Sequence, residues 1–250
     1  MEHLEFPGES AEYRAARNTL LEDEMALRLQ IEHIAAQRRA LPPGGPLKED
    51  YVFEGVGPDG GPTKIRLSEL FAPGKDSLVL YSFMYGPERA KPCPGCTHFL
   101  DSFDGVLRHA PQRTNVYVVA KSPLARILEW ARHRGWTHLN FLSTAGNDYD
   151  KDYFGDSLGH TPEMERQMEF TPGKVSDMPI MNVFRRRDGD IRHFWASEML
   201  YAAKDPGQDF RHNDLADPLW GLFDMTPEGR GDFNPKLSYP SGDSAALSKD

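Results

Sequence analysis

Residues 77–96 read SLVLYSFMYGPERAKPCPGC, an apolar run that leads through a short polar stretch to two cysteines. The apolar run over residues 77–84 predicts a strand that is buried on both faces of a sheet. Residues 93–108 have apolar side chains at helical spacing and predict a helix with one face turned inward. Its inward positions are Phe99, Leu100, Phe103 and Leu107. This strand–helix order places Cys93 and Cys96 at the beginning of the helix.

Cys93 and Cys96 are the only two cysteines in the 250-residue chain. A framework of structural disulfides needs several dispersed pairs. A closed zinc site needs four ligands, so a zinc ion here would also require histidines or carboxylates. We therefore interpret the pair as a dithiol that can open and close as a disulfide, and we expect no cofactor.

The chain around the cysteines alternates between strands and helices. Residues 115–120 predict a second buried strand. Ser122-Pro123 predicts the start of the next helix, because serine is a good N-cap and proline suits the first helical position. Further predicted elements are strands at residues 51–54, 63–67 and 139–142, a helical turn at 68–71, and the end of the second helix near Gly135. This order predicts an α/β protein with a central mixed sheet, parallel crossovers and flanking helices.

A hairpin is predicted in the C-terminal half of the chain. Asp188-Gly189-Asp190 separates two strand-like runs at residues 178–184 and 191–195, and Asp-Gly between such runs is a strong hairpin signal. Residues 149–175 have the composition of a loop, with a short helix predicted near 162–168. Another short helix is predicted at residues 219–223.

The N-terminal region predicts one long helix over residues 10–40, capped by Ser10 and followed by a proline- and glycine-rich linker at 42–46. Its apolar stripe consists of Tyr13, Leu20, Leu27, Ile31 and Ile34. We expect this helix to pack on the main body or on a second subunit, and a homodimer through it is one expectation. The predicted organisation is a helical extension at 1–45, a main domain at 46–230 with an insertion at about 148–176, and a disordered tail at 231–250.

The net charge of −9 argues against a nucleic-acid-binding protein, since the basic footprint is missing. The Arg185-Arg186-Arg187 run is too short to replace it. No stretch approaches 18 uncharged apolar residues, so no membrane span is expected. The N-terminus also lacks the basic start and apolar core of a secretory signal. We therefore expect a cytoplasmic protein without nucleic-acid or membrane partners, whose two thiols are reduced at rest.

The predicted position of Cys93 explains how its thiol could become reactive. The nucleophile in thiol–disulfide exchange is the thiolate, which the unpaired N–H groups and the dipole of a helix N-terminus stabilise. Pro94 fits the first turn, where a missing N–H costs nothing. Arg89 and Lys91 add positive charge. Cys96, one turn further, should be more buried, so we expect Cys93 to attack and Cys96 to resolve the mixed disulfide.

Two alternative functions stay open at this point. One is a metal- or ligand-binding module, in which Cys93 and Cys96 bind a metal together with histidines such as His98 or His193. His98 lies two residues beyond Cys96 and fits a polar surface position or a supporting role better than a place on the same helix face. The other is a non-catalytic interaction protein that docks through the N-terminal helix. Ser82, Tyr85 and the run 193–195 could line a pocket, although aromatic strand residues more often belong to a core.

The element order resembles the thioredoxin superfamily, in which a cis-proline opens the strand facing the dithiol; Pro179 holds the matching place. The segments at 64–70 and 124–142 are closer to the peroxiredoxin-like branch. A narrower resemblance is carried by YGP at 85–87, PCPGCT at 92–97, VAKSP at 119–123, RGW at 134–136, STAGN at 143–147, NVF at 182–184, IRHFW at 191–195 and DPLW at 217–220. These motifs resemble an uncharacterised bacterial family, domain of unknown function 899, whose members are expected to be dithiol–disulfide oxidoreductases. The resemblance implies that Pro179 shapes the substrate groove, and we expect Tyr85, Met178 and Trp195 to contact the substrate.

The chain departs from its thioredoxin-like relatives in three respects. The dipeptide Pro94-Gly95 has the reverse of the thioredoxin order and is more similar to glutaredoxins. The buried acid that thioredoxins place behind the cysteines has no evident equivalent. Arg89 and Ala90 stand where a peroxiredoxin would carry its Thr-x-x-Cys site, which disfavours peroxide reduction. We therefore expect a dithiol–disulfide oxidoreductase acting on a protein or small-molecule disulfide or thiol, with an unknown electron donor.

Overall fold

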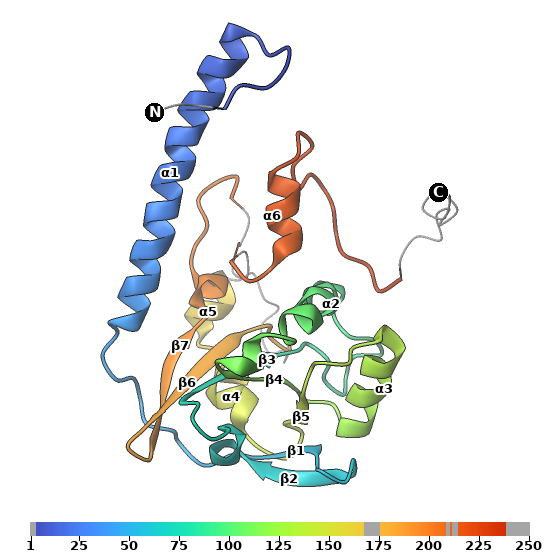
Figure 1. The fold of residues 1–250 in the computed structure, drawn as a ribbon. Helices are drawn as coiled ribbons and strands as arrows, with labels where there is room; N and C mark the ends of the chain where they lie inside the picture. The colour runs from blue at the N-terminus through green and yellow to red at the C-terminus, as the bar shows by residue number, and fades with distance from the viewer. Residues whose placement is uncertain (1–3, 168–175, 209–210, 212–214, 239–250) are drawn as a thin grey trace. The chain divides into compact units, whose positions relative to one another are not determined.

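The computed structural model describes residues 4–167, 176–208, 211 and 215–238. The chain divides into two compact units, Met1–Gly44 and Gly45–Asp250 (Figure 1). The elements of the second unit, with η for 3₁₀-helices, are β1 (Val52–Val56), β2 (Pro62–Arg66), η1 (Leu67–Leu70), β3 (Ser77–Ser82), α2 (Pro94–Val106), η2 (Ala110–Gln112), β4 (Asn115–Ala120), α3 (Leu124–Arg134), β5 (Phe141–Ser143), α4 (Tyr149–Asp152), η3 (Ser157–Gly159), α5 (Pro162–Gln167), β6 (Met181–Arg187), β7 (Asp190–Ala196), η4 (Glu198–Tyr201) and α6 (Pro218–Asp224).

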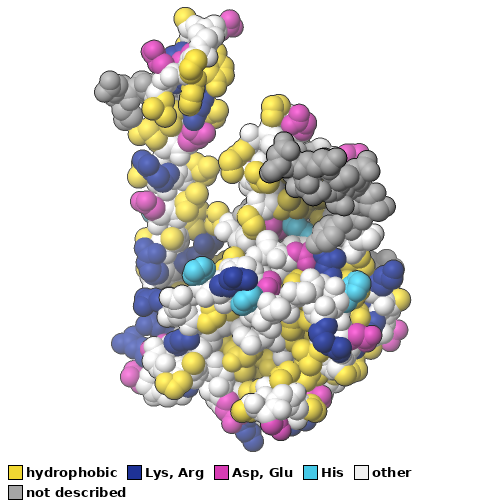
Figure 2. Space-filling model, turned by 45° about the vertical axis from the view of Figure 1, so that its right-hand side comes forward, with side chains coloured by type: hydrophobic (Ala, Val, Ile, Leu, Met, Phe, Trp, Pro, Cys, Tyr) yellow, Lys and Arg dark blue, Asp and Glu magenta, His cyan; other side chains and the backbone are white. Residues whose placement is uncertain are grey.

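The first unit is built on the helix α1 (Ala11–Arg39), which confirms the long N-terminal helix. Ser10 caps it, because its side-chain oxygen accepts a hydrogen bond from the backbone N–H of Tyr13 at 3.1 Å. No residue of α1 is buried. Figure 2 shows hydrophobic side chains on the surface of this helix, and Leu20 and Leu27 of the expected stripe are 51% and 59% exposed.

The second unit contains a seven-stranded sheet in the order β2-β1-β5-β4-β3-β6-β7. Strands β3, β4 and β5 run parallel, whereas β6 and β7 continue the sheet antiparallel beyond β3. The predicted mixed sheet is confirmed. The order β3-α2-β4-α3 followed by the β6–β7 hairpin is a thioredoxin-like arrangement.

The buried strand β3 separates two apolar cores, because its side chains alternate between the two faces of the sheet. Tyr81 points to the face covered by α2 and α3, where it joins Phe99 and Ile127. Leu80 points to the opposite face, which Tyr149 of α4 and the 3₁₀-helix η1 help to cover. The cysteines therefore lie on the α2 side of the sheet.

The β6–β7 hairpin turns at Asp188 and Gly189, as the sequence predicts. Both residues have positive φ, +52° and +88°, as a two-residue hairpin turn of the primed type requires. The outer edge of β7 is also occupied: the N–H of His193 donates to the carbonyl of Gly45 at 3.0 Å, and the N–H of Leu47 donates to Ile191 at 2.9 Å. Residues 45–47 thus pair with the last strand of the sheet.

Three details differ from the sequence-based expectations. Helix α3 has Pro123, not Ser122, at its N-cap, and the Ser122 hydroxyl instead accepts a hydrogen bond from Arg126 at 3.0 Å. The segment 149–175, expected to be loop around one short helix, also contains α4 and η3; the predicted short helix is confirmed as α5, while residues 168–175 lie outside the described residues. The expected tail begins within described chain: residues 231–235 line a cavity, and only 239–250 lie outside the described residues.

Candidate active site

Cys93 and Cys96 lie where the sequence predicts, at the beginning of α2. Cys93 is the N-cap residue and Pro94 occupies the first turn. The backbone of Cys93 is fixed on both sides: its N–H donates to the carbonyl of Met84 at 3.0 Å, and its own carbonyl accepts from the N–H of Thr97 at 3.0 Å. Both thiols are free. Cys93 is partly exposed and Cys96 is buried, so the two thiols differ in accessibility.

The surroundings of Cys93 stabilise its thiolate. A hydrogen bond from Cys96 lowers the pKa of Cys93 most, and burial opposes this effect. Backbone N–H groups of Cys96 and Gly95 and the positive charge of Arg89 lower the pKa further. Together these interactions bring the pKa of Cys93 to about 6. A substantial part of this thiol is therefore ionised at neutral pH, which is the form that attacks a disulfide.

Cys96 has the opposite properties. Burial raises the pKa of Cys96 well above that of an ordinary thiol, and its hydrogen bond to Cys93 raises it further. A hydrogen bond with Tyr81 acts in the other direction. Tyr81 is itself buried, and its ring centroid lies 4.8 Å from that of Phe99. The hydroxyl group of Tyr81 on β3 thus contacts the thiol of Cys96.

Tyr81 is a site residue that the sequence analysis missed, because it assigned this residue only to a strand. The available signal was the phenol in an otherwise apolar buried run, since a buried tyrosine hydroxyl usually finds a polar partner. Which partner it finds depends on the tertiary arrangement of β3 and α2.

The loop between β3 and α2 is held by two side chains from distant parts of the chain. The carboxylate of Asp177 accepts hydrogen bonds from the N–H of Gly86 at 2.7 Å and from Nε of Arg89 at 3.1 Å. The guanidinium of Arg126 on α3 donates to the carbonyls of Gly86, Arg89 and Ala90. Arg126 also lies over the ring of Tyr85, 4.2 Å from its centroid. These contacts fix the position from which the chain enters the cysteine helix.

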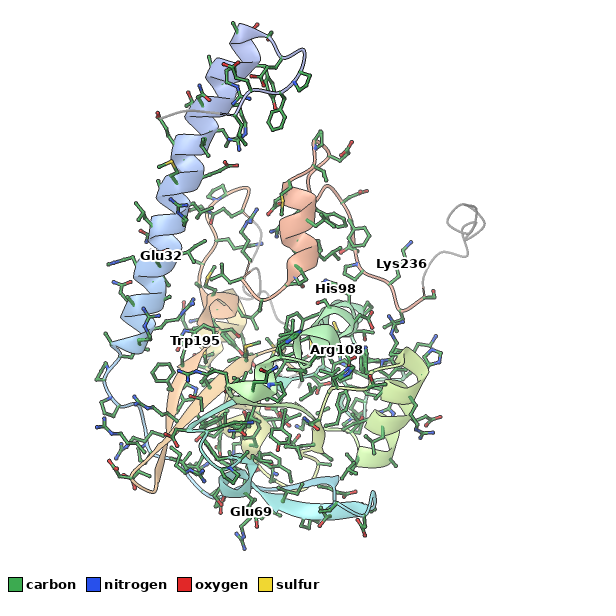
Figure 3. The ribbon with its side chains drawn as sticks, in the orientation of Figure 1. Glu32, Glu69, His98, Arg108, Trp195 and Lys236 are labelled. Carbon is green, nitrogen blue, oxygen red and sulfur yellow. The ribbon has the colours of Figure 1, made fainter. Side chains whose placement is uncertain are left out.

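His98 connects the cysteine helix to α6. Its Nδ1 lies 3.1 Å from the carbonyl oxygen of Gly95, and its Nε2 lies 3.0 and 3.2 Å from the two carboxylate oxygens of Asp217. Its ring also contacts Trp220 edge-on, with 5.5 Å between the centroids. Figure 3 shows His98 on α2, below α6. Burial lowers the pKa of His98, although Asp217 acts against this.

A cavity of about 420 Å³ lies beside the two cysteines. Its lining includes Cys93, Cys96, Tyr81, Phe99, His98, Pro179, Asp217, Trp220, Arg211 and residues 230–235. The dithiol therefore opens into a cavity whose walls come from both the sheet and the C-terminal part of the chain.

The structure brings Pro179 to the cysteines but not the other three residues expected to contact substrate. Pro179 lines the cavity, whereas Tyr85, Met178 and Trp195 are not among its lining residues. Tyr85 is buried in the core near Phe83, and Met178 is also buried. Trp195 pairs with Val183 within the hairpin, and Figure 3 labels it on β7.

The cis form expected for Pro179 is not found, and this expectation is corrected. The described residues contain no cis peptide bond. The trans form is the lower-energy isomer of a bond before proline. Hydrogen bonds hold the chain on both sides: Met178 donates to Gly155 at 2.9 Å, and Ile180 accepts from Ser82 at 2.8 Å. The trans segment is thus anchored beside the cavity.

The two histidines considered as metal ligands beside the cysteines contact other residues. In the described part of the chain, no group of three or more His, Cys, Asp or Glu side chains is arranged to hold a metal ion. His98 is bonded to Asp217, and His193 lies 3.0 Å from the Asn182 side-chain oxygen.

Among the described residues, every helix is too short or too polar to cross a bilayer.

A buried acid does occur, on the other face of the sheet. Asp150 of α4 is 3% exposed and accepts a hydrogen bond from the hydroxyl of Thr144. Gly155 packs against it so closely that a side chain at residue 155 would overlap the carboxylate. Burial raises the pKa of Asp150 to about 7, and the nearby charge of Asp156 also raises it, against the hydrogen bond from Thr144. The sequence analysis missed this acid because an aspartate-rich segment indicated an exposed loop.

These features can be compared with known proteins. The family model described as "Bacterial protein of unknown function (DUF899)" matches residues 4–244. The chain belongs to the DUF899 family. No curated protein matches it. Membership of DUF899 confirms the family resemblance and covers both the cysteine helix and the α6 region.

Several solved structures resemble this DUF899 protein at low sequence identity. The peroxidoxin BcpB from Mycobacterium tuberculosis is 17% identical, with a TM-score of 0.43, covering 70% of this chain and 94% of that chain. A cysteine-to-serine mutant of peroxiredoxin Q from Xanthomonas campestris is 13% identical, with a TM-score of 0.42 and coverage of 59% and 78%. The mitochondrial 2-Cys peroxiredoxin from Plasmodium falciparum is 14% identical, with a TM-score of 0.40 and coverage of 70% and 93%. Likeness at this level does not identify a shared active site.

Proposed function

We propose that this DUF899 protein is a thiol–disulfide oxidoreductase. The Cys93 thiolate attacks a disulfide R–S–S–R′, forms a mixed disulfide with one half and releases the other as a thiolate, which takes up a proton. Cys96 loses its proton and attacks the Cys93 sulfur, which forms the Cys93–Cys96 disulfide and releases the second thiol. Two electrons pass from the protein to the substrate, and a reductant or a reverse exchange resets the pair.

The difference between the two thiols is the observation that carries this proposal. Cys93 is accessible and has a pKa of about 6, whereas burial raises the pKa of Cys96. A partly exposed nucleophile with a buried partner one helical turn away suits the two successive steps of the exchange. Pro179 and the phenol of Tyr81 lie against the same cavity as the two thiols.

The pH dependence of Cys93 alkylation tests the proposed activation. With iodoacetamide, the rate of the first alkylation is expected to rise with a midpoint near pH 6, because the thiolate is the reacting form. A Cys96→Ala variant should move the midpoint upward, since it removes the largest stabilising hydrogen bond. Mass spectrometry identifies the modified cysteine. A midpoint at or above about pH 8.5 in the unmodified protein would contradict an activated thiolate.

The direction of electron transfer follows from the reduction potential of the Cys93–Cys96 couple. A potential of about −270 mV would suit a reductant, whereas a potential of about −120 mV would suit an oxidant. We propose that the protein acts in the cytoplasm, where a dithiol is kept reduced at rest. Equilibration with glutathione buffers measures the potential directly.

We also propose that α1 forms a homodimer contact. Its Leu20 and Leu27 are 51% and 59% exposed, seven residues apart on one stripe. A Leu27→Glu variant is expected to shift the protein from dimer to monomer in sedimentation velocity, because it places a charge in the apolar contact. Arg28→Glu, on a neighbouring side of the helix, is the matched control. A monomeric unmodified protein at micromolar concentration would contradict this contact.

A further inference from the structure

Part of the cavity wall opposite the cysteines comes from the C-terminal part of the chain. We call α6 together with residues 230–235 the cover, because they line the cavity along with the cysteines. The cover meets the cysteine helix at His98, whose ring contacts Trp220 of α6 and whose Nε2 is bonded to Asp217, the N-cap residue of α6. His98 and Asp217 are 119 positions apart in the chain, so this contact is tertiary.

The cover is also held together internally. The ring centroid of Phe233 lies 6.2 Å from that of Trp220 and 5.1 Å from that of Phe223. The guanidinium of Arg230 lies over Trp220, 5.3 Å from its centroid, and pairs with both carboxylate oxygens of Asp224 at 2.7 and 2.8 Å. These contacts join α6 to the returning chain, so the cover is a packed wall rather than a single strand of chain.

The cavity beside Cys93 is partly open and of limited size. Its volume of about 420 Å³ lies within the range of small-molecule sites. A sphere of this volume is about 9 Å across, whereas five residues of extended chain are roughly 17 Å long. A disulfide in a folded protein is flanked by chain on both sides of each cysteine. Pro179 lines this cavity together with the two cysteines.

We propose that the substrate is a low-molecular-weight disulfide, or the corresponding thiol in the reverse direction, rather than a disulfide of a folded protein. This inference rests on the thiol–disulfide exchange proposed above and names the class of molecule that the cover admits. The lining carries both signs of charge, with Arg230 and Asp232 as examples, and aromatic surface from Trp220 and Phe233. Such walls suit small organic disulfides with polar ends.

The test compares small and protein disulfides in single-turnover reactions of the full chain. Protein reduced and freed of reductant is mixed with 2-hydroxyethyl disulfide, with glutathione disulfide, or with insulin. Formation of the Cys93–Cys96 disulfide is followed by acid quenching and thiol labelling. Each second-order rate constant is divided by that of dithiothreitol with the same disulfide, which corrects for intrinsic reactivity. A second experiment measures the reverse reaction, in which oxidised protein is mixed with 2-mercaptoethanol or with reduced insulin. The comparison between small and protein substrates uses the direction that has the higher rate constants.

The normalised rate constant is expected to be at least about 100-fold higher for the better small substrate than for insulin, because the cover hinders the larger molecule. An equal or higher value for insulin would overturn the substrate class while leaving the exchange reaction intact. If no substrate exchanges with Cys93 in either direction, the proposed function itself fails, and the substrate class with it.

Opening the cover supplies a second readout. Trp220→Ala is expected to raise the rate constant for insulin by at least about 10-fold relative to the rate constant that the same variant has for the small disulfide. Phe233→Ala serves the same purpose if Trp220→Ala does not fold. Leu222→Ala is the matched control, since Leu222 is on α6, is exposed and does not line the cavity. An unchanged insulin rate in both folded cover variants would contradict a role of the cover in selection.

Discussion

Replacing Cys93 with serine is expected to reduce disulfide exchange to the uncatalysed background, a loss of at least about a thousandfold. A serine hydroxyl does not ionise near neutral pH, so the variant lacks the activated nucleophile. Replacing Cys96 with serine should have a different result, because the first attack on Cys93 remains possible while the second step has no thiol. We expect one substrate half to remain bound to Cys93 in this variant.

Intact-mass spectrometry distinguishes these outcomes. After a brief reaction with 2-hydroxyethyl disulfide, Cys96→Ser should carry one mercaptoethanol adduct per chain, and dithiothreitol should release it. Cys93→Ser should carry little or none, since Cys96 is buried and burial raises the pKa of its thiol. Far-ultraviolet circular dichroism and thermal unfolding verify that both variants fold. Exchange that persists in Cys93→Ser, or an adduct that prefers Cys96, would reverse the assigned roles.

Replacing Asp150 with asparagine is expected to remove a large part of the pH dependence of stability. Burial raises the pKa of Asp150 from 3.8 to about 7, so the folded state retains a proton that the unfolded state releases. The free energy of unfolding therefore decreases as the pH rises from about 4 to about 7. For a single group shifted by this amount, the decrease approaches about 4 kcal/mol above pH 7.

Urea unfolding at pH 5 and pH 8 measures this effect. Asp150→Asn keeps the shape of the side chain and an oxygen able to accept from Thr144, but it stays neutral at both pH values. Its stability relative to the unmodified protein should be higher by a few kcal/mol at pH 8 than at pH 5. Glu32→Gln, on the exposed surface of α1, is the control for a lost negative charge. An unchanged difference between the two pH values would exclude Asp150 as the titrating group.

The sequence predicted the elements whose signals are local. The apolar run over β3, the helix behind Cys93 and the Asp188-Gly189 turn each depend on neighbours a few residues apart, and all three are confirmed. The position of Cys93 at the N-cap follows from the same local pattern. Family motifs and strand–helix alternation were therefore sufficient for the fold and for the position of the dithiol.

The rest of the site depends on contacts between distant residues that leave no periodic pattern. Asp217 reaches His98 across 119 positions, from a region rich in aspartate, proline and glycine. Asp150 lies in a segment of similar composition and is nevertheless buried, because Thr144 and Gly155 accommodate its carboxylate. Both the cover and the buried acid therefore lie in segments whose composition usually indicates exposed loops, so composition alone does not predict them.

The pairing of residues 45–47 with β7 also has a consequence for self-association. An open edge strand presents unpaired N–H and C=O groups that can extend a sheet into a neighbouring molecule. At β7 part of these groups is already used by Gly45 and Leu47. At the opposite end of the sheet, β2 carries Pro62, which lacks an N–H, and the charged residue Lys64, two features that discourage pairing. The two ends of the sheet are thereby protected against edge-to-edge aggregation by different means.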